Sequence, residues 1–249
     1  MLSDPAFYFV AIPAVLLYGV AKGGFGGAIA ILAVPLMTLV MPPAQAAAIL
    51  LPILVVMDMV AIYTYRGHFD GLALRLLLPG AVLGVCIGYL LAEYLNDEIM
   101  RLIVGSVAVV FGLQFLAGMS TFVGSTHHRP TAMAFGTLAG FTSFSIHAGG
   151  PPFTMYLIPK GVAPFVYAGT AALFFSVVNL AKLPAYWALG QFTQENLIYS
   201  AVLIPVAPLG VLLGRKLVGL SNPQFYYRLI AAFLVVIGLK LIYDGVTGL

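Results

Sequence analysis

Hydrophobic stretches long enough to cross a lipid bilayer follow one another along almost the whole chain. A transmembrane helix needs about 20 apolar residues, and the short breaks leave room for roughly eight to ten hydrophobic segments. The apolar runs cover approximately 5–21, 26–41, 44–65, 72–93, 99–119, 131–146, 152–159, 163–189, 196–217 and 225–243. Only 8% of the residues are charged, whereas a soluble domain carries about 25%. The sequence therefore predicts an all-α polytopic membrane protein.

Charge and cysteine content exclude several other classes of protein. The formal net charge of +3 is too small and too scattered to indicate a nucleic-acid partner. The single cysteine, Cys86, excludes an intramolecular disulfide and a cysteine-based metal site. Residues 1–4 contain no basic side chain, so we expect the first apolar run to be a retained span and not a signal peptide. We expect no metal, no cofactor and no nucleic acid, and a lipid bilayer as the surrounding partner.

The two halves of the chain resemble each other across a linker at residues 120–130. The spacing Pro-x4-Gly-x3-Gly at 79–88 recurs at 205–214, and the glycine cluster at 23–27 falls opposite 146–150. The shared order and nearly constant spacing of these matches indicate an internal duplication. The sequence therefore predicts two transmembrane repeats.

The predicted N-terminal repeat covers 1–119 and the C-terminal repeat covers 131–249, with four to five helical segments in each. If each repeat crosses the membrane an odd number of times, most lysines and arginines share one face. The positive-inside rule makes that face cytoplasmic and places both termini outside, in a multi-pass protein of the bacterial inner membrane. An odd number also inverts the repeats, as is common in secondary transporters. The predicted cytoplasmic cations are Arg66, Arg75, Arg129, Lys160, Arg215, Lys216 and Arg228.

Two apolar stretches are too long for one span and are interrupted by glycine. As one helix, residues 5–41 would measure about 55 Å, against a hydrocarbon core of about 30 Å. The glycines at 23–27 therefore predict either a re-entrant hairpin or two short crossings near the start of the first repeat. Residues 131–159, broken at 147–152, predict the same arrangement in the second repeat.

Broken helices inside a membrane expose backbone groups that lipid cannot satisfy. Pro151 and Pro152 lack the N–H groups of a continuing helix, and a restarting helix directs its first amides and positive dipole end into a cavity. Two such breaks in inverted repeats predict an anion site near the membrane midplane, with close helix packing as the alternative role of the glycines. The predicted substrate-binding residues are Gly24, Gly26, Gly27, His147, Gly149, Gly150, Asn179 and Lys182.

Each ionisable residue within the apolar runs could have a functional or a structural role. Placing a carboxylate inside a membrane costs free energy, so a functional role is expected and Asp58 is a candidate for proton coupling. Alternatively, Asp58 could simply join helices through a hydrogen bond. Lys182 could pair with Asp58, attract substrate, or snorkel to the interface beside the aromatic residues 186–187. His147 could donate to an anion, carry a proton or cap a helix. Lys22 either attracts the anion or adds to the cytoplasmic positive charge.

With these motifs in place, the sequence resembles the TauE/SafE family of sulfite and organosulfonate exporters. The likeness runs over nearly the whole chain in family order, and three stretches carry it. They are Gly23-Gly-Phe-Gly-Gly27 followed by Val34-Pro35 and Pro42-Pro43-Ala44-Gln45-Ala46-Ala47; His147-Ala-Gly-Gly-Pro-Pro-Phe153; and Ala168-Gly169-Thr170 with Ser176-x2-Asn179-x2-Lys182, Tyr186 and Gly190.

The resemblance implies an anion permease of two repeats, with sulfite, sulfoacetate or another organosulfonate bound near the glycine breaks. One departure concerns residues 46–50, which read Ala-Ala-Ala-Ile-Leu where the family often has serine or threonine. Polar substrate contacts from that segment are therefore not carried over.

The sequence thus predicts a secondary transporter that exports small sulfur oxyanions, with no catalytic residues. An intramembrane enzyme is disfavoured because the chain contains neither His-Glu-x-x-His nor Gly-x-Ser-x-Gly. A passive anion channel and a membrane assembly factor are the alternative functions. The sequence leaves open a homodimer, the direction of transport and the identity of the anion.

Overall fold

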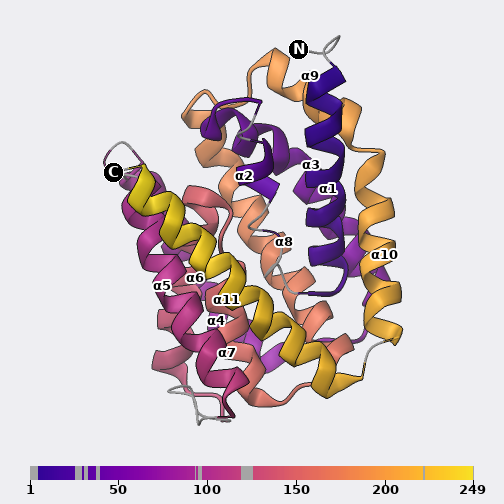
Figure 1. The fold of residues 1–249 in the computed structure, drawn as a ribbon, viewed down its shortest axis with the longest axis vertical. Coiled ribbons are helices and arrows are strands. Elements are labelled where there is room, and N and C mark those ends of the chain that lie inside the picture. The colour runs from indigo at the N-terminus through magenta and orange to yellow at the C-terminus, as the bar shows by residue number, and fades with distance from the viewer. Residues whose placement is uncertain are drawn as a thin grey trace.

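The computed structural model describes residues 5–25, 30, 33–37, 40–92, 94, 97–118, 126–220 and 222–248 (Figure 1). Within this part of the chain the regular secondary structure is helical throughout. In chain order the elements are α1 (Pro5–Gly24), α2 (Ala33–Met37), α3 (Pro43–Thr64), α4 (Gly71–Leu90), α5 (Asp97–Leu116), α6 (Arg129–Ile146), α7 (Gly150–Leu157), the 3-10 helix η2 (Ile158–Lys160), α8 (Pro164–Ala188), α9 (Gln194–Leu203), α10 (Val206–Leu220) and α11 (Pro223–Thr247).

Most described helices follow the apolar runs closely, whereas in the run at 26–41 the described helix covers only Ala33–Met37. The run at 196–217 is not one straight helix, because α9 ends at Leu203 and α10 continues at an angle of 46°. Pro205 lies at the bend and has no N–H to donate to the preceding turn. Pro79, at the matching place in the first half, is accommodated within the continuous helix α4.

Five helices of the described chain are long and apolar enough to cross a membrane: α1, α3, α4, α8 and α11. The bent pair α9 and α10 makes a sixth candidate. The described residues thus give five or six candidate spans, against the eight to ten segments predicted for the whole chain. The finding confirms an all-helical, multi-pass membrane protein.

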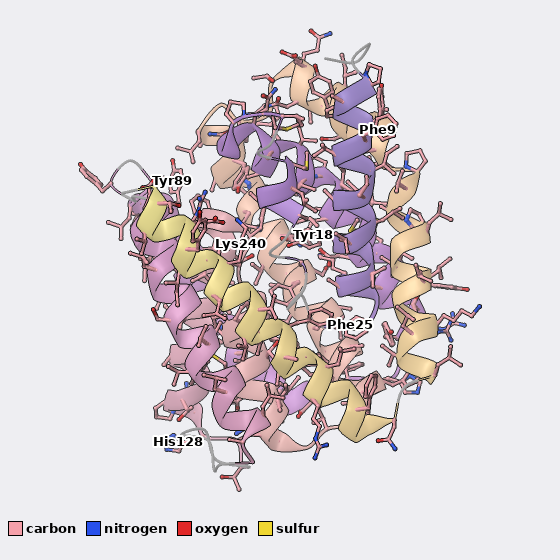
Figure 2. All side chains as sticks on the ribbon, in the orientation of Figure 1. Phe9, Tyr18, Phe25, Tyr89, His128 and Lys240 are labelled. Atoms are coloured by element: carbon pink, nitrogen blue, oxygen red, sulfur yellow. The ribbon has the colours of Figure 1, made fainter. Side chains whose placement is uncertain are left out.

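The side chains are distributed as expected for a protein surrounded by lipid. Large apolar residues point outward, among them Phe9 on α1, with 81% of its surface exposed, and Leu209 on α10, with 63% exposed (Figure 2). The buried face of α1 is instead made of small residues such as Ala11, Ala14 and Ala21. Lipid provides no hydrophobic driving force between helices, so close packing of small residues replaces it.

Three long helix pairs form the frame of the molecule: α1 with α10, α4 with α6, and α5 with α11. Figure 1 shows α5 and α11 on one side and α1 with α10 on the other. Glycines allow the backbones to meet, since a Cβ on Gly19 would lie 2.7 Å from the Cα of Gly210, and one on Gly105 would lie 2.6 Å from the Gly238 carbonyl oxygen. The same holds for Gly84, where a Cβ would lie 2.1 Å from the Thr137 carbonyl oxygen of α6.

The helices α3 and α8 pack against each other between these pairs, where the two halves meet (Figure 1). They are the most buried of the candidate spans, with 61% of α3 and 56% of α8 inside the protein. A polar side chain on the buried face of either helix is therefore screened from lipid.

Both predicted breaks are present. The helix α1 ends at Gly24, and α6 ends at Ile146 before α7 begins at Gly150. With 8 residues, α7 is about 12 Å long, less than half of the roughly 30 Å hydrocarbon core. Each long helix is therefore followed by a break and a short helical segment.

Candidate functional site

Among the described residues, four ionisable side chains that could carry a full charge lie inside the helix bundle, all next to a break or on the central helices. Lys22 is in the last turn of α1, and His147 directly follows α6. Asp58 is on α3 and Lys182 is on α8. At most 6% of the surface of any of them is exposed. A buried charge is tolerated only when it is paired and hydrogen-bonded, so the partners of each define the chemistry of the site.

Lys22 and Asp58 form a buried ion pair between α1 and α3. The Lys22 ammonium donates to Oδ1 of Asp58, and it lies 3.4 Å from the Leu54 carbonyl oxygen. The second carboxylate oxygen, Oδ2, accepts a hydrogen bond of 2.7 Å from the side-chain amide of Asn179 on α8. Both carboxylate oxygens are thus engaged, and Asp58 joins three helices drawn from both halves.

Lys182 is surrounded by neutral acceptors. Its Nζ atom lies 3.1 Å from the carbonyl oxygen and 3.2 Å from the hydroxyl oxygen of Ser143, and 2.9 Å from Nδ1 of His147. An ammonium group has three N–H donors and no acceptor, so three acceptors match the charged form. Among the described residues, no carboxylate forms an ion pair with Lys182.

His147 has a left-handed backbone conformation, with φ of 54°, which ends α6 at the second break. Its Nε2 atom lies 3.1 Å from the carbonyl oxygen of Ala47 on α3, so this nitrogen donates. Its Nδ1 atom faces the Lys182 ammonium and must accept. The hydrogen bonds therefore fix the neutral Nε2–H tautomer, and the ring stacks on Tyr186 with 6.2 Å between centroids.

At the first break, the glycines are closely packed against other helices. The hydroxyl of Tyr65 donates to the Gly23 carbonyl, and a Cβ on Gly24 would overlap with Val218 on α10. Packing alone therefore accounts for glycine at 24. Gly26 and Gly27, two further predicted substrate ligands, lie outside the described residues.

At the second break, Gly149 and Gly150 are buried where α7 begins. A Cβ on Gly149 would lie 2.6 Å from the Ala139 carbonyl oxygen and 2.8 Å from Cβ of Ser143. Glycine at 149 is thus required for contact with α6. The binding of an anion by the amides of Gly149 and Gly150 stays a prediction.

The predicted site residues fall into two neighbouring groups, Asp58 with Asn179 and His147 with Lys182. The interpretation that Lys182 snorkels to the interface is wrong, because this side chain is fully buried while Trp187 is 76% exposed. Lys182 does not pair directly with Asp58 either, because Lys22 occupies that place. The sequence analysis missed Ser143, although its position four residues before His147 on a polar turn of α6 could have indicated it.

A second polar cluster lies around His127, at the end of the linker. Its Nε2 atom lies 3.0 Å from Oδ2 of Asp70, and its Nδ1 atom lies 2.9 Å from the hydroxyl oxygen of Tyr156. Asp70 also caps α4 by accepting from the Ala73 amide. The linker end is therefore tied to the start of α4 and to α7.

Comparison with known proteins adds evidence that is independent of this geometry. Residues 11–241 match the profile of the family described as Sulfite exporter TauE/SafE. The chain is 24% identical to a protein of Cupriavidus necator (strain H16) named "Probable sulfite/organosulfonate exporter TauE". This alignment extends over 184 residues and covers 72% of this chain and 71% of that protein. No solved structure matches the chain significantly. The family match includes both breaks and all four buried ionisable residues.

Proposed function

Because this chain belongs to the TauE/SafE family of sulfite exporters, we propose that it is a secondary transporter that exports small sulfur oxyanions such as sulfite, sulfoacetate or other organosulfonates. The observation that carries the proposal is Lys182, a fully buried lysine whose three hydrogen-bond acceptors among the described residues are neutral, so that its ammonium form has no ion-pair partner there. An uncompensated charge inside a protein favours binding of an opposite charge.

The proposed substrate site lies between the two halves, around Lys182, His147 and Asn179. Backbone amides at the second break, where α7 begins, would complete it in agreement with the preference of oxyanions for helix N-termini. The predicted glycine ligands of the first break would add to it. The full set comprises Gly24, Gly26, Gly27, His147, Gly149, Gly150, Asn179 and Lys182. Lys182 and His147 are buried, which supports a carrier in an occluded state. In an open channel, the residues that bind the anion would instead face water.

The two halves, 1–119 and 131–249, are proposed to be inverted repeats. The packing supports this arrangement, because α1 pairs with α10 of the second half while α6 pairs with α4 of the first. The corresponding helices α5 and α11 run antiparallel, since Gly105 meets Gly238 and Gly245 meets Leu102. Movement of the two halves about the site would then give alternating access.

The orientation in the bacterial inner membrane is also part of the proposal. Both termini would be non-cytoplasmic, since the cations near the ends of α3, α4, α6, α8 and α10 gather on the opposite face. In this orientation the membrane potential drives an anion outward with about 2.3 kcal/mol per charge per 100 mV.

Asp58 is the candidate for proton coupling. A proton on this carboxylate would neutralise it and weaken both its ion pair with Lys22 and its hydrogen bond from Asn179. Since Lys22 immediately precedes the first break, protonation would loosen α1 from α3 at that place.

Ligand-dependent stability of the detergent-solubilised protein tests the substrate proposal. Sulfite, sulfoacetate, sulfate and acetate are titrated against the wild type, Lys182→Met and Lys240→Met, the last being an exposed lysine on α11. A bound sulfonate at 100 times its Kd would stabilise the wild type by about 2.7 kcal/mol. We expect Lys240→Met to retain this effect and Lys182→Met to lose at least about 30-fold in affinity.

Two outcomes would count against the proposal. If no anion changes the stability of the folded wild type, the result favours the interpretation as a membrane assembly factor. If anions bind but proteoliposomes show no saturable counterflow, the protein is a channel. A replacement at Gly149 is a poor test, because any side chain there would collide with α6.

A further inference from the structure

With Lys182 protonated, the buried side chains of the site carry a net charge of +1. Lys22 and Asp58 neutralise each other within their ion pair. Lys182 carries an ammonium with three neutral acceptors, and His147 is held in its neutral tautomer. Among the described residues, no other lysine, arginine, histidine or acidic side chain is fully buried. An occluded site of this charge is neutralised by an anion of charge −1.

A singly charged sulfonate can bind without any change in protonation. Two of the three Lys182 N–H donors point at the backbone carbonyl and the hydroxyl of Ser143. Both Ser143 groups can instead form hydrogen bonds within their own helix. Those two donors can turn to the sulfonate while the third stays on Nδ1 of His147. The site and its ligand are then neutral together.

A doubly charged anion leaves one negative charge uncompensated in a water-excluded site, which is costly. The nearest group that can take up a proton is Nδ1 of His147, 2.9 Å from Nζ of Lys182. Other charged or titratable groups around His147 are Lys182 and Tyr186 from α8, Lys22 from α1 and, through Lys22 and Asn179, Asp58 from α3. The two ammonium groups repel a proton on the ring until a second negative charge offsets them.

We infer that this site selects its substrate by total charge: it binds singly charged sulfonates as they are, and binds doubly charged ones only together with a proton on Nδ1 of His147. This inference rests on the proposed function and adds a substrate class and a pH dependence to it. It also predicts exclusion of a sulfonate that carries its own ammonium group, which leaves the positive charge of the site uncompensated.

Three two-carbon sulfonates form a matched series for the test: isethionate ends in a hydroxyl, sulfoacetate in a carboxylate and taurine in an ammonium. Their affinities are measured by calorimetry on the detergent-solubilised wild type between about pH 6 and 8, the range around an ordinary histidine pKa. We expect the isethionate affinity to be independent of pH. The sulfoacetate affinity should rise as pH falls, by up to about tenfold per unit, and taurine should bind most weakly.

Two variants identify the proton acceptor. His147→Asn cannot be protonated, while asparagine tolerates the left-handed backbone at this position. His128→Asn is the control at an exposed loop histidine. We expect His147→Asn to weaken anion binding and to abolish the pH slope for sulfoacetate, and His128→Asn to keep it. Calorimetry in two buffers of different ionisation heat should show about one proton taken up per sulfoacetate and none per isethionate.

The outcomes separate this inference from the proposed function. If isethionate and sulfoacetate bind with the same pH independence, or if the slope survives in His147→Asn, charge selection through His147 is wrong while the transporter proposal stands. If no sulfonate binds at any pH, the proposed function itself fails.

Discussion

The two buried lysines of this protein are alike in burial and differ in their partners. Lys22 lies at the break of the first half and is neutralised by Asp58. Lys182 lies beside the break of the second half, and its hydrogen-bond partners within the described part of the chain are Ser143 and His147. The first arrangement joins two helices through a compensated ion pair, and the second leaves a charge for a ligand. Burial of a lysine alone therefore does not identify a binding residue; the charge of its neighbours does.

The largest effect is expected when the first pair is broken. Asp58→Leu leaves Lys22 charged and unpaired inside the bundle, so we expect a loss of stability of about 3–5 kcal/mol. The double variant Lys22→Met with Asp58→Leu removes both charges and should recover most of this loss. Unfolding in detergent measures both. A double variant as unstable as the single one would show that the pair acts through something other than charge compensation.

Lys182→Met should behave in the opposite way. Because the ammonium has no carboxylate partner, its removal also removes the cost of keeping a charge away from water. In the absence of anion we expect a change in stability below about 2 kcal/mol, although anion binding is lost. If Lys182→Met destabilised the ligand-free protein as strongly as Asp58→Leu, the proposed difference between a structural Lys22 and a ligand-binding Lys182 would be wrong.

Asn179 should contribute an intermediate effect, because it supports Asp58 without carrying charge. Asn179→Ala removes a buried hydrogen bond of 2.7 Å to a carboxylate, which corresponds to about 1.5–3 kcal/mol. Leu180→Ala, one residue along the same helix and exposed, is the control and should change stability by less than about 1 kcal/mol. Equal effects of the two substitutions would argue against a role of Asn179 at Asp58.

The smallest effect is expected at the contact between His127 and Asp70, whose side chains are 19% and 17% exposed. Solvent screens this interaction, so His127→Gln should cost no more than about 1 kcal/mol. Thermal unfolding compared with His128→Gln, its exposed neighbour, measures the difference. A loss as large as that of Asp58→Leu would mean that the linker end is as important as the buried pair.

Hydropathy predicted most of the helices well, because membrane spans are determined by the length and polarity of a segment. Both features can be recognised from neighbouring residues in the sequence. The breaks at 23–27 and 147–152 were also visible, since glycine and proline act on the backbone within one turn. Local rules failed at Pro205, which breaks its helix, whereas Pro79 in a matching motif does not. The difference depends on neighbouring helices and not on the motif.

The site was only partly predictable, for a similar reason. Asp58, His147, Asn179 and Lys182 could be chosen because polar residues are rare in apolar runs. The sequence did not indicate that Lys22 would take Asp58 and leave Lys182 to Ser143, since these partners come from helices far apart in the chain. Gly149 shows the converse, because a residue chosen for an anion is already explained by packing against Ala139.

The glycine contacts between long helices also have a consequence for biosynthesis. The helix α6 follows α4 closely in the chain, so their seam can close as soon as α6 is made. The helix α1 instead waits for α10, because Gly19 meets Gly210, roughly 190 residues later. At about 5–20 residues per second, α1 remains without its partner for roughly 10–40 s. The nascent chain therefore carries an uncovered glycine face through almost the whole of its translation, and during that time it depends on the insertion machinery or on lipid to protect it.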